Sequence, residues 1–118
     1  MLFRSFPLPS QEDKNRFLLY CVDYVDHNYF RELTLDGIVR QAAVSRSEFC
    51  KDFKTLTGYS FHQYLNRCRI RDAAQRIRRG EKITAVSQSC GYQDFSTFYR
   101  NFTKIMGVSP TEYKCRDL

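Results

Sequence analysis

Apolar side chains recur every three or four residues along most of this chain, which is the spacing of one face of an α-helix. Residues with helix-capping side chains stand before these apolar runs, and glycines stand after several of them. No alternating run with hairpin turn residues, the pattern of half-buried strands, competes with this periodicity. The pattern therefore predicts an all-α fold with about seven helices.

Capping residues and glycines predict where these helices begin and end. The side chain of a capping residue accepts a hydrogen bond from a backbone N–H about three residues later, and glycine tolerates the positive φ at which many helices stop. The predicted starts are Ser10-x-x-Asp13, Thr34, Ser45-x-x-Glu48, Ser60-x-x-Gln63 and Ser109-Pro110-x-Glu112, and the predicted stops are Gly58, Gly80 and Gly107. Residues 45–56, 60–79 and 94–106 are expected to form three of the helices, with the longest over 60–79.

An internal repeat divides the chain into two similar units. At a shift of 48, Leu35, Ile38, Ala42 and Ala43 correspond to Ile83, Val86, Cys90 and Gly91; at a shift of 49, Phe49, Phe53, Gly58, Ser60 and Tyr64 correspond to Phe98, Phe102, Gly107, Ser109 and Tyr113. The one-residue slip falls between Ala43 and Phe49, where a turn between helices is expected. Each unit therefore predicts a short helix, a tight turn and a second helix, which is the helix-turn-helix arrangement.

The segment 60–79 lies between the two copies and carries two apolar stripes. The early stripe is Phe61, Tyr64, Leu65 and Cys68, and the late stripe is Ile70, Ala73, Ala74 and Ile77. Because the stripes are rotated relative to each other, we expect this helix to pack on the first unit early and on the second unit late. The expected organisation is a tail or linker over 1–10 followed by one domain over 11–118. Within that domain, 11–58 and 82–118 are two subdomains, and 60–79 is the long central helix that joins them.

The distribution of charged residues along the chain indicates a negatively charged binding partner. The net charge is +6, yet residues 1–36 hold four basic and six acidic side chains, while residues 37–118 hold fifteen basic and seven acidic ones. A concentrated basic surface favours a polyanion, because neutralised phosphates release condensed counterions. The alternative is a solvated charged surface, to which the many arginines of 60–79 contribute by facing water or bridging to nearby acids.

Other classes of protein find little support in the composition. No apolar run approaches the roughly 20 residues of a membrane span, and the proline-broken opening is too short for a signal peptide, so a soluble cytoplasmic protein is expected. Five cysteines occur without a CxxC pair and only two histidines are present, so neither a disulfide framework, a metal site nor a cofactor is expected. No glycine-rich phosphate loop or catalytic triad spacing indicates an enzyme.

These residues closely resemble the AraC/XylS family of bacterial transcription regulators. The second unit carries the fuller match, in Gly91-Tyr92-x-Asp94-x-Ser96-x-Phe98-x-Arg100-x-Phe102 followed by Gly107-Val108-Ser109-Pro110 and Tyr113. The first unit matches through Ser45, Phe53-Lys54, Gly58, Ser60 and Tyr64-Leu65, followed by Arg69 and Ala73. Two positions depart from the family pattern: Ala43 stands where a turn glycine is usual, and Ser87 where alanine is usual.

The resemblance implies that the second helix of each unit enters the major groove of double-stranded promoter DNA. Helical geometry selects the side chains that point away from Phe49, Phe53 and Leu56 in one unit, and from Phe98, Phe102 and Ile105 in the other. The predicted base contacts are Arg46, Ser47, Cys50, Lys51, Gln93, Phe95, Ser96 and Arg100. The predicted phosphate contacts are Lys54, Ser60, Thr103, Lys104 and Ser109. Among the base contacts, Phe95 is suited to a thymine methyl group.

The predicted function is sequence-specific DNA binding for transcription regulation, with the two recognition helices in successive major grooves. The alternative is a helix-turn-helix module that binds another protein. The resemblance also implies RNA polymerase as a partner, association with the nucleoid, and an effector-sensing or dimerising domain before this module in longer relatives. Residues 1–10 fit either a linker to such a domain or a natural start at Met1.

Overall fold

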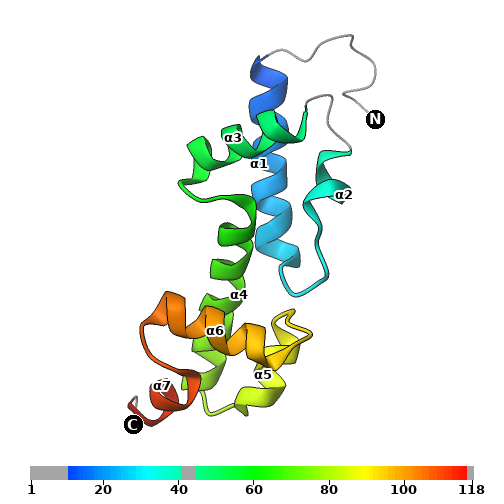
Figure 1. Ribbon diagram of the computed structural model, residues 1–118. Coiled ribbons are helices and arrows are strands. Elements are labelled where there is room, and N and C mark those ends of the chain that lie inside the picture. Colours follow the sequence, from blue (N-terminus) through cyan, green and yellow to red (C-terminus); the bar gives the residue numbers. More distant parts are fainter. Residues whose placement is uncertain (1–10, 41–44, 117–118) are drawn as a thin grey trace. The chain divides into compact units, whose positions relative to one another are not determined.

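The computed structural model describes residues 11–40 and 45–116, and this part of the chain contains seven α-helices and no strand (Figure 1). The helices are α1 (Gln11–Asn28), α2 (Leu35–Val39), α3 (Arg46–Thr57), α4 (Phe61–Arg78), α5 (Ile83–Ser89), α6 (Phe95–Met106) and α7 (Pro110–Arg116). This order confirms the predicted all-α fold class. The expectations placed on Ser10, Ala42 and Ala43 fall outside the described residues.

The chain forms two compact units that share one helix. Among the described residues, the first unit contains 11–28, 33–40 and 45–64, and the second unit contains 29–32 and 65–116. The start of α4 belongs to the first unit, where the Phe61 ring lies 5.8 Å from the ring of Phe53. The later part of α4 supplies Ile70, Ala73, Ala74 and Ile77 to the core of the second unit. The early part of α4 therefore packs in the first unit and the late stripe in the second, as the sequence predicts, although the boundary falls after Tyr64 within the early stripe.

Aromatic packing between α1 and α3 builds the first core. The Phe17 ring meets the Phe49 ring edge-on at 6.0 Å, and Phe49 lies 5.8 Å from Phe53. Burial of phenylalanine side chains contributes roughly 1.5–3 kcal/mol each by removing apolar surface from water. Leu56 does not join them. It is 48% exposed, because it lies near the end of α3 and borders an open groove instead of the core.

The core of the second unit gathers residues from α4, α5 and α6. Its buried members are Ile70, Ala73, Ala74, Ile77, Val86, Cys90, Tyr92, Phe98 and Phe102, with Ile83, Ile105, Met106 and Tyr113 packed against them. Ser87 is also buried, and its hydroxyl donates to the Thr84 carbonyl oxygen at 2.9 Å. That bond satisfies the polar group inside its own helix, which explains how serine replaces the usual alanine at this position.

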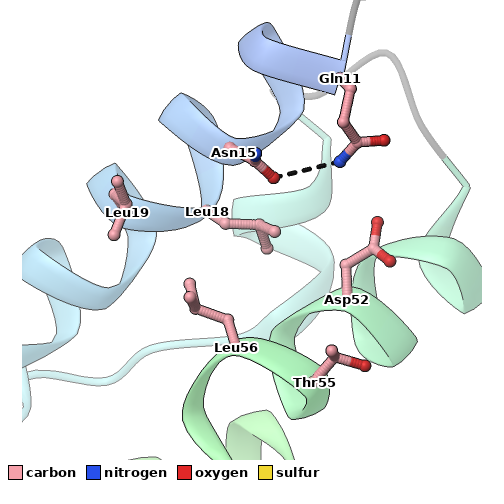
Figure 2. A pocket seen from close by; sticks show the side chains of 7 residues that line it. All are labelled: Gln11, Asn15, Leu18, Leu19, Asp52, Thr55 and Leu56. Carbon is pink, nitrogen blue, oxygen red and sulfur yellow. Dashed lines mark hydrogen bonds between the residues drawn. The ribbon is translucent and has the colours of Figure 1, made fainter.

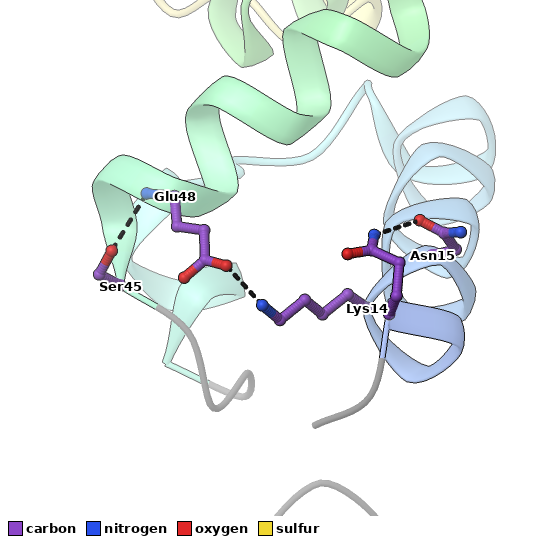
Figure 3. Close-up of polar contacts among 5 residues, drawn as sticks. Lys14, Asn15, Ser45 and Glu48 are labelled. Carbon is purple, nitrogen blue, oxygen red and sulfur yellow. Dashed lines mark hydrogen bonds and ion pairs between the residues drawn. The ribbon is translucent and has the colours of Figure 1, made fainter. Parts of the chain in front are cut away.

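The helix starts predicted at Thr34, Ser45, Ser60 and Ser109 are confirmed, and the start at Ser45 differs in one detail. Ser60 and Gln63 form the complete reciprocal capping box, with bonds of 3.2 and 3.0 Å. Ser45 accepts from the Glu48 backbone N–H at 3.1 Å, but the Glu48 carboxylate binds Lys14 Nζ of α1 at 2.6 Å (Figure 3). The acid expected to serve the cap of α3 therefore forms an ion pair that joins α3 to α1.

Candidate nucleic-acid interface

The outer face of α3 consists of side chains that the core does not use. Arg46, Ser47, Lys51 and Lys54 are exposed, and Cys50 is half-buried. Arg46 is partly committed, because its Nη1 donates to the Asp36 carboxylate at 2.6 Å. Both side chains of that pair are more than half exposed, so the pair contributes little to stability and leaves Arg46 available to a phosphate or base.

The outer face of α6 is built in the same way but carries different chemistry. Phe95, Ser96 and Arg100 are exposed, as is Gln93 just before the helix. Tyr99 shares this face and is 41% exposed, although the sequence did not nominate it as a contact. The signal for it was present, since position 99 lies one turn after Phe95.

Asp94 fixes the start of α6. Its carboxylate accepts from the Thr97 hydroxyl at 2.8 Å and from the Thr97 backbone N–H at 3.1 Å. These two bonds lower the pKa of Asp94 below its usual value, and the charge of Arg100 adds to the effect. Asp94 therefore acts as a charged N-cap of α6. Arg100 is exposed on the outer face of the same helix.

The residues predicted to hold phosphates fall into two groups. Lys54, Thr103 and Lys104 are exposed in the second half of α3 or α6. Ser60 and Ser109 are half-buried, and each oxygen accepts a backbone N–H of the helix it caps, at 3.2 and 3.1 Å. Because a hydroxyl can accept and donate at once, both serines still have an O–H to offer.

The turn that leads into α6 is packed against a half-buried arginine, Arg69. Arg69 Nε donates to the Tyr29 carbonyl oxygen at 2.6 Å, and Nη2 donates to the Arg31 carbonyl oxygen at 2.8 Å. The same guanidinium lies 5.3 Å from the centre of the Tyr92 ring. Burial lowers the pKa of Arg69. The sequence predicted that most arginines of residues 60–79 face water or bridge to nearby acids. Arg69 instead binds backbone carbonyl oxygens and an aromatic ring.

Asp72 of α4 contacts residues on both sides of this arrangement, Tyr29 and Cys90. Its side chain is hydrogen bonded to the Tyr29 hydroxyl, accepts from Cys90 Sγ at 3.6 Å and pairs with Arg76 Nε at 3.3 Å. Burial, together with the Asp72 charge, raises the pKa of the Cys90 thiol to about 12, so this cysteine stays a neutral core residue. Tyr29 is thus held at its carbonyl by Arg69 and at its hydroxyl by Asp72. Sequence reasoning missed this network.

A groove lies between α1 and α3. Gln11, Asn15, Leu18, Leu19, Asp52, Thr55 and Leu56 line it (Figure 2). None of these side chains was predicted to touch DNA. Across the described residues, no three His, Cys, Asp or Glu side chains gather where a metal ion would bind. Within the same ranges, no helix has both the length and the apolar character needed to cross a membrane.

Known proteins share this arrangement. A family model described as a helix-turn-helix domain matches residues 38–116, which include both α3 and α6. The chain belongs to the AraC/XylS family. The curated lactose operon transcription activator of Staphylococcus xylosus is 32% identical over 101 residues, which cover 85% of this chain and 36% of the activator.

Solved structures of family members superimpose on the same helices. The C-terminal domain of the response regulator AraT from Geobacillus stearothermophilus has a TM-score of 0.78 at 25% identity, covering 85% of this chain and 84% of that one. A DNA-binding transcriptional dual regulator of Escherichia coli K-12 has a TM-score of 0.69 at 32% identity, covering 85% and 96%. This chain therefore carries an AraC-type DNA-binding domain. It spans less than half the length of curated regulators that it matches.

Proposed function

We propose that this AraC-type domain binds specific double-stranded promoter DNA and thereby regulates transcription. The observation that carries the proposal is the pair of helices α3 and α6, each capped at its start, buried along a phenylalanine stripe and exposed along a face with basic side chains. Basic side chains supply affinity for phosphates, and the polar side chains between them supply hydrogen bonds to base edges.

The two helices enter successive major grooves in this proposal. Residues 11–58 and 82–118 form the two DNA-binding subdomains, and residues 60–79 join them. The 18 residues of α4 rise about 27 Å. That length is comparable with the roughly 34 Å between successive major-groove sites on one side of B-DNA.

Individual side chains receive separate roles. Lys51 and Arg100 pair with guanine O6 and N7, and Gln93 pairs with adenine, because those donor and acceptor geometries match. The remaining base contacts are Arg46, Ser47, Cys50, Phe95 and Ser96, and the phosphate contacts are Lys54, Ser60, Thr103, Lys104 and Ser109. The proposal also includes two partners, RNA polymerase and an effector-sensing or dimerising domain.

Selection of bound duplexes from a random pool tests the proposal. We expect a bipartite consensus with two half-sites about one helical turn apart, and an affinity for it that falls steeply as salt increases. A consensus with one half-site would contradict the two-groove arrangement while keeping DNA binding. No enrichment of any duplex would instead favour the alternative, a helix-turn-helix module that binds another protein.

A further inference from the structure

Two aromatic rings lie exposed side by side on the outer face of α6. Phe95 is 42% exposed and Tyr99 is 41% exposed, and their ring centres are 6.2 Å apart. Phe98, which belongs to the buried stripe, lies 5.8 Å from Phe95 and is itself completely buried. Phe98 therefore belongs to the core of the second unit, whereas the outer pair adds apolar surface that the fold leaves partly exposed.

The first unit shows that the helix-turn-helix fold does not require this pair. At the shift of 49 residues that relates the two helices, Arg46 corresponds to Phe95 and Cys50 to Tyr99. Arg46 pairs with Asp36, and Cys50 is half-buried. Since α3 carries a charged residue and a thiol at these positions, the aromatic rings on α6 are a feature of the second unit alone.

The charged residues near Phe95 and Tyr99 indicate which kind of ligand covers these rings. Arg100 and Lys104 follow on exposed positions of the same helix, so the surface attracts a polyanion. The major groove of DNA presents hydrogen-bonding edges and one apolar group, the 5-methyl of thymine. A ring pair beside a guanidinium matches a sequence in which thymine methyls lie next to a guanine.

We infer that Phe95 and Tyr99 select thymine in the half-site that faces α6 by covering its 5-methyl groups; this rests on the proposed function. The first half-site, which faces Arg46 and Cys50, lacks this preference. The two halves of the target therefore differ in base composition, and the domain binds DNA in one orientation only.

Replacement of thymine by deoxyuracil tests the inference, because it removes the methyl group and keeps the base pairing. In the duplex selected above, each thymine is replaced in turn and the Kd is measured. Removal of one buried methyl is expected to weaken binding by about fourfold. We expect sensitive thymines in one half-site only. The variants Phe95→Ala and Tyr99→Ala should bind the thymine and deoxyuracil duplexes equally well.

A matched variant separates this effect from a general loss of aromatic surface. Tyr20 on α1 is 55% exposed and lies outside the proposed interface, so Tyr20→Ala should keep the wild-type sensitivity to deoxyuracil. If no thymine is sensitive in the wild-type protein, or if Phe95→Ala and Tyr99→Ala both keep the sensitivity, the inference is wrong while DNA binding stands. Self-association of the free protein that both variants abolish would overturn it in favour of a protein interface. A failure to select any duplex would refute the proposed function itself.

Discussion

The guanidinium of Arg69 donates a hydrogen bond from Nε to the backbone carbonyl oxygen of Tyr29 at 2.6 Å. A second bond, from Nη2 to the carbonyl oxygen of Arg31, fixes the same short segment to α4. Gly91, in the turn before α6, lies directly against this contact: a Cβ built there would come within 2.8 Å of both Arg69 Nε and the Tyr29 oxygen. The turn that leads into α6 is therefore supported by a residue of the central helix.

Loss of this support should destabilise the domain. Arg69→Ala removes a charged donor from two carbonyl oxygens, and hydrogen bonds to charged groups are worth about 1.5–3 kcal/mol each. We expect a loss of at least about 2 kcal/mol in the free energy of unfolding, measured in urea. Arg69→Lys should recover only part of it, because an ammonium lacks the fork geometry. Full recovery by lysine would show that charge alone matters.

Two glycines with positive φ should respond differently to alanine. Gly91 has φ +109 and Gly107 has φ +83, so alanine at either position costs about 1–2 kcal/mol in conformational strain. A Cβ at Gly107 meets nothing within 4 Å, whereas one at Gly91 collides with backbone and guanidinium. Gly91→Ala should therefore lower the melting temperature clearly more than Gly107→Ala. Equal effects would mean that the turn moves aside without cost.

Two phenylalanines of α6 should separate stability from binding. Phe98 is completely buried, so Phe98→Ala is expected to cost about 3–5 kcal/mol of unfolding free energy. Phe95 is 42% exposed, and Phe95→Ala should cost less than about 1.5 kcal/mol while weakening DNA binding. Denaturation and a mobility shift on the same proteins measure both quantities. A large stability loss for Phe95→Ala would place that ring in the core.

Arg100 and Lys104 should differ in the kind of DNA binding they support. Arg100→Ala is expected to cost about 1–3 kcal/mol on the preferred site and to relax the sequence preference at one position. Lys104→Ala should weaken all duplexes alike and reduce the salt dependence by about one ion. Competition between specific and random duplexes distinguishes the two. Unchanged affinity and preference in Arg100→Ala would place the recognition surface elsewhere.

Acid should lower the free energy of unfolding by protonating Asp94, the N-cap of α6. Its pKa is lower in the folded protein than the ordinary value of 3.8, so its charge stabilises the fold above that value. This stabilisation is lost as the pH falls through the lower, folded-state pKa. Asp94→Asn keeps a capping oxygen without the charge, so its unfolding free energy should fall less steeply below pH about 4. Parallel acid curves for the two proteins would contradict the role of the charge.

The local and periodic features of this protein follow from its sequence. Caps such as Thr34 and Ser60 act over three residues, and the buried phenylalanines of α3 and α6 repeat with the helical period. Sequence spacing alone determines such features, because the groups involved lie within one turn of a helix. The all-α class, the helices of the described residues and the buried phenylalanine stripes of α3 and α6 could all be predicted on this basis.

Tertiary structure decided the contacts that join distant segments. Arg69 meets Tyr29 across 40 residues, and Lys14 meets Glu48 across 34, a partner that a capping pattern would have kept within α3. Leu56 has the helical spacing of a core residue but is 48% exposed, because burial depends on whether another element covers that position. Spacing determines which side chains share a helix face, and only packing determines what each face meets.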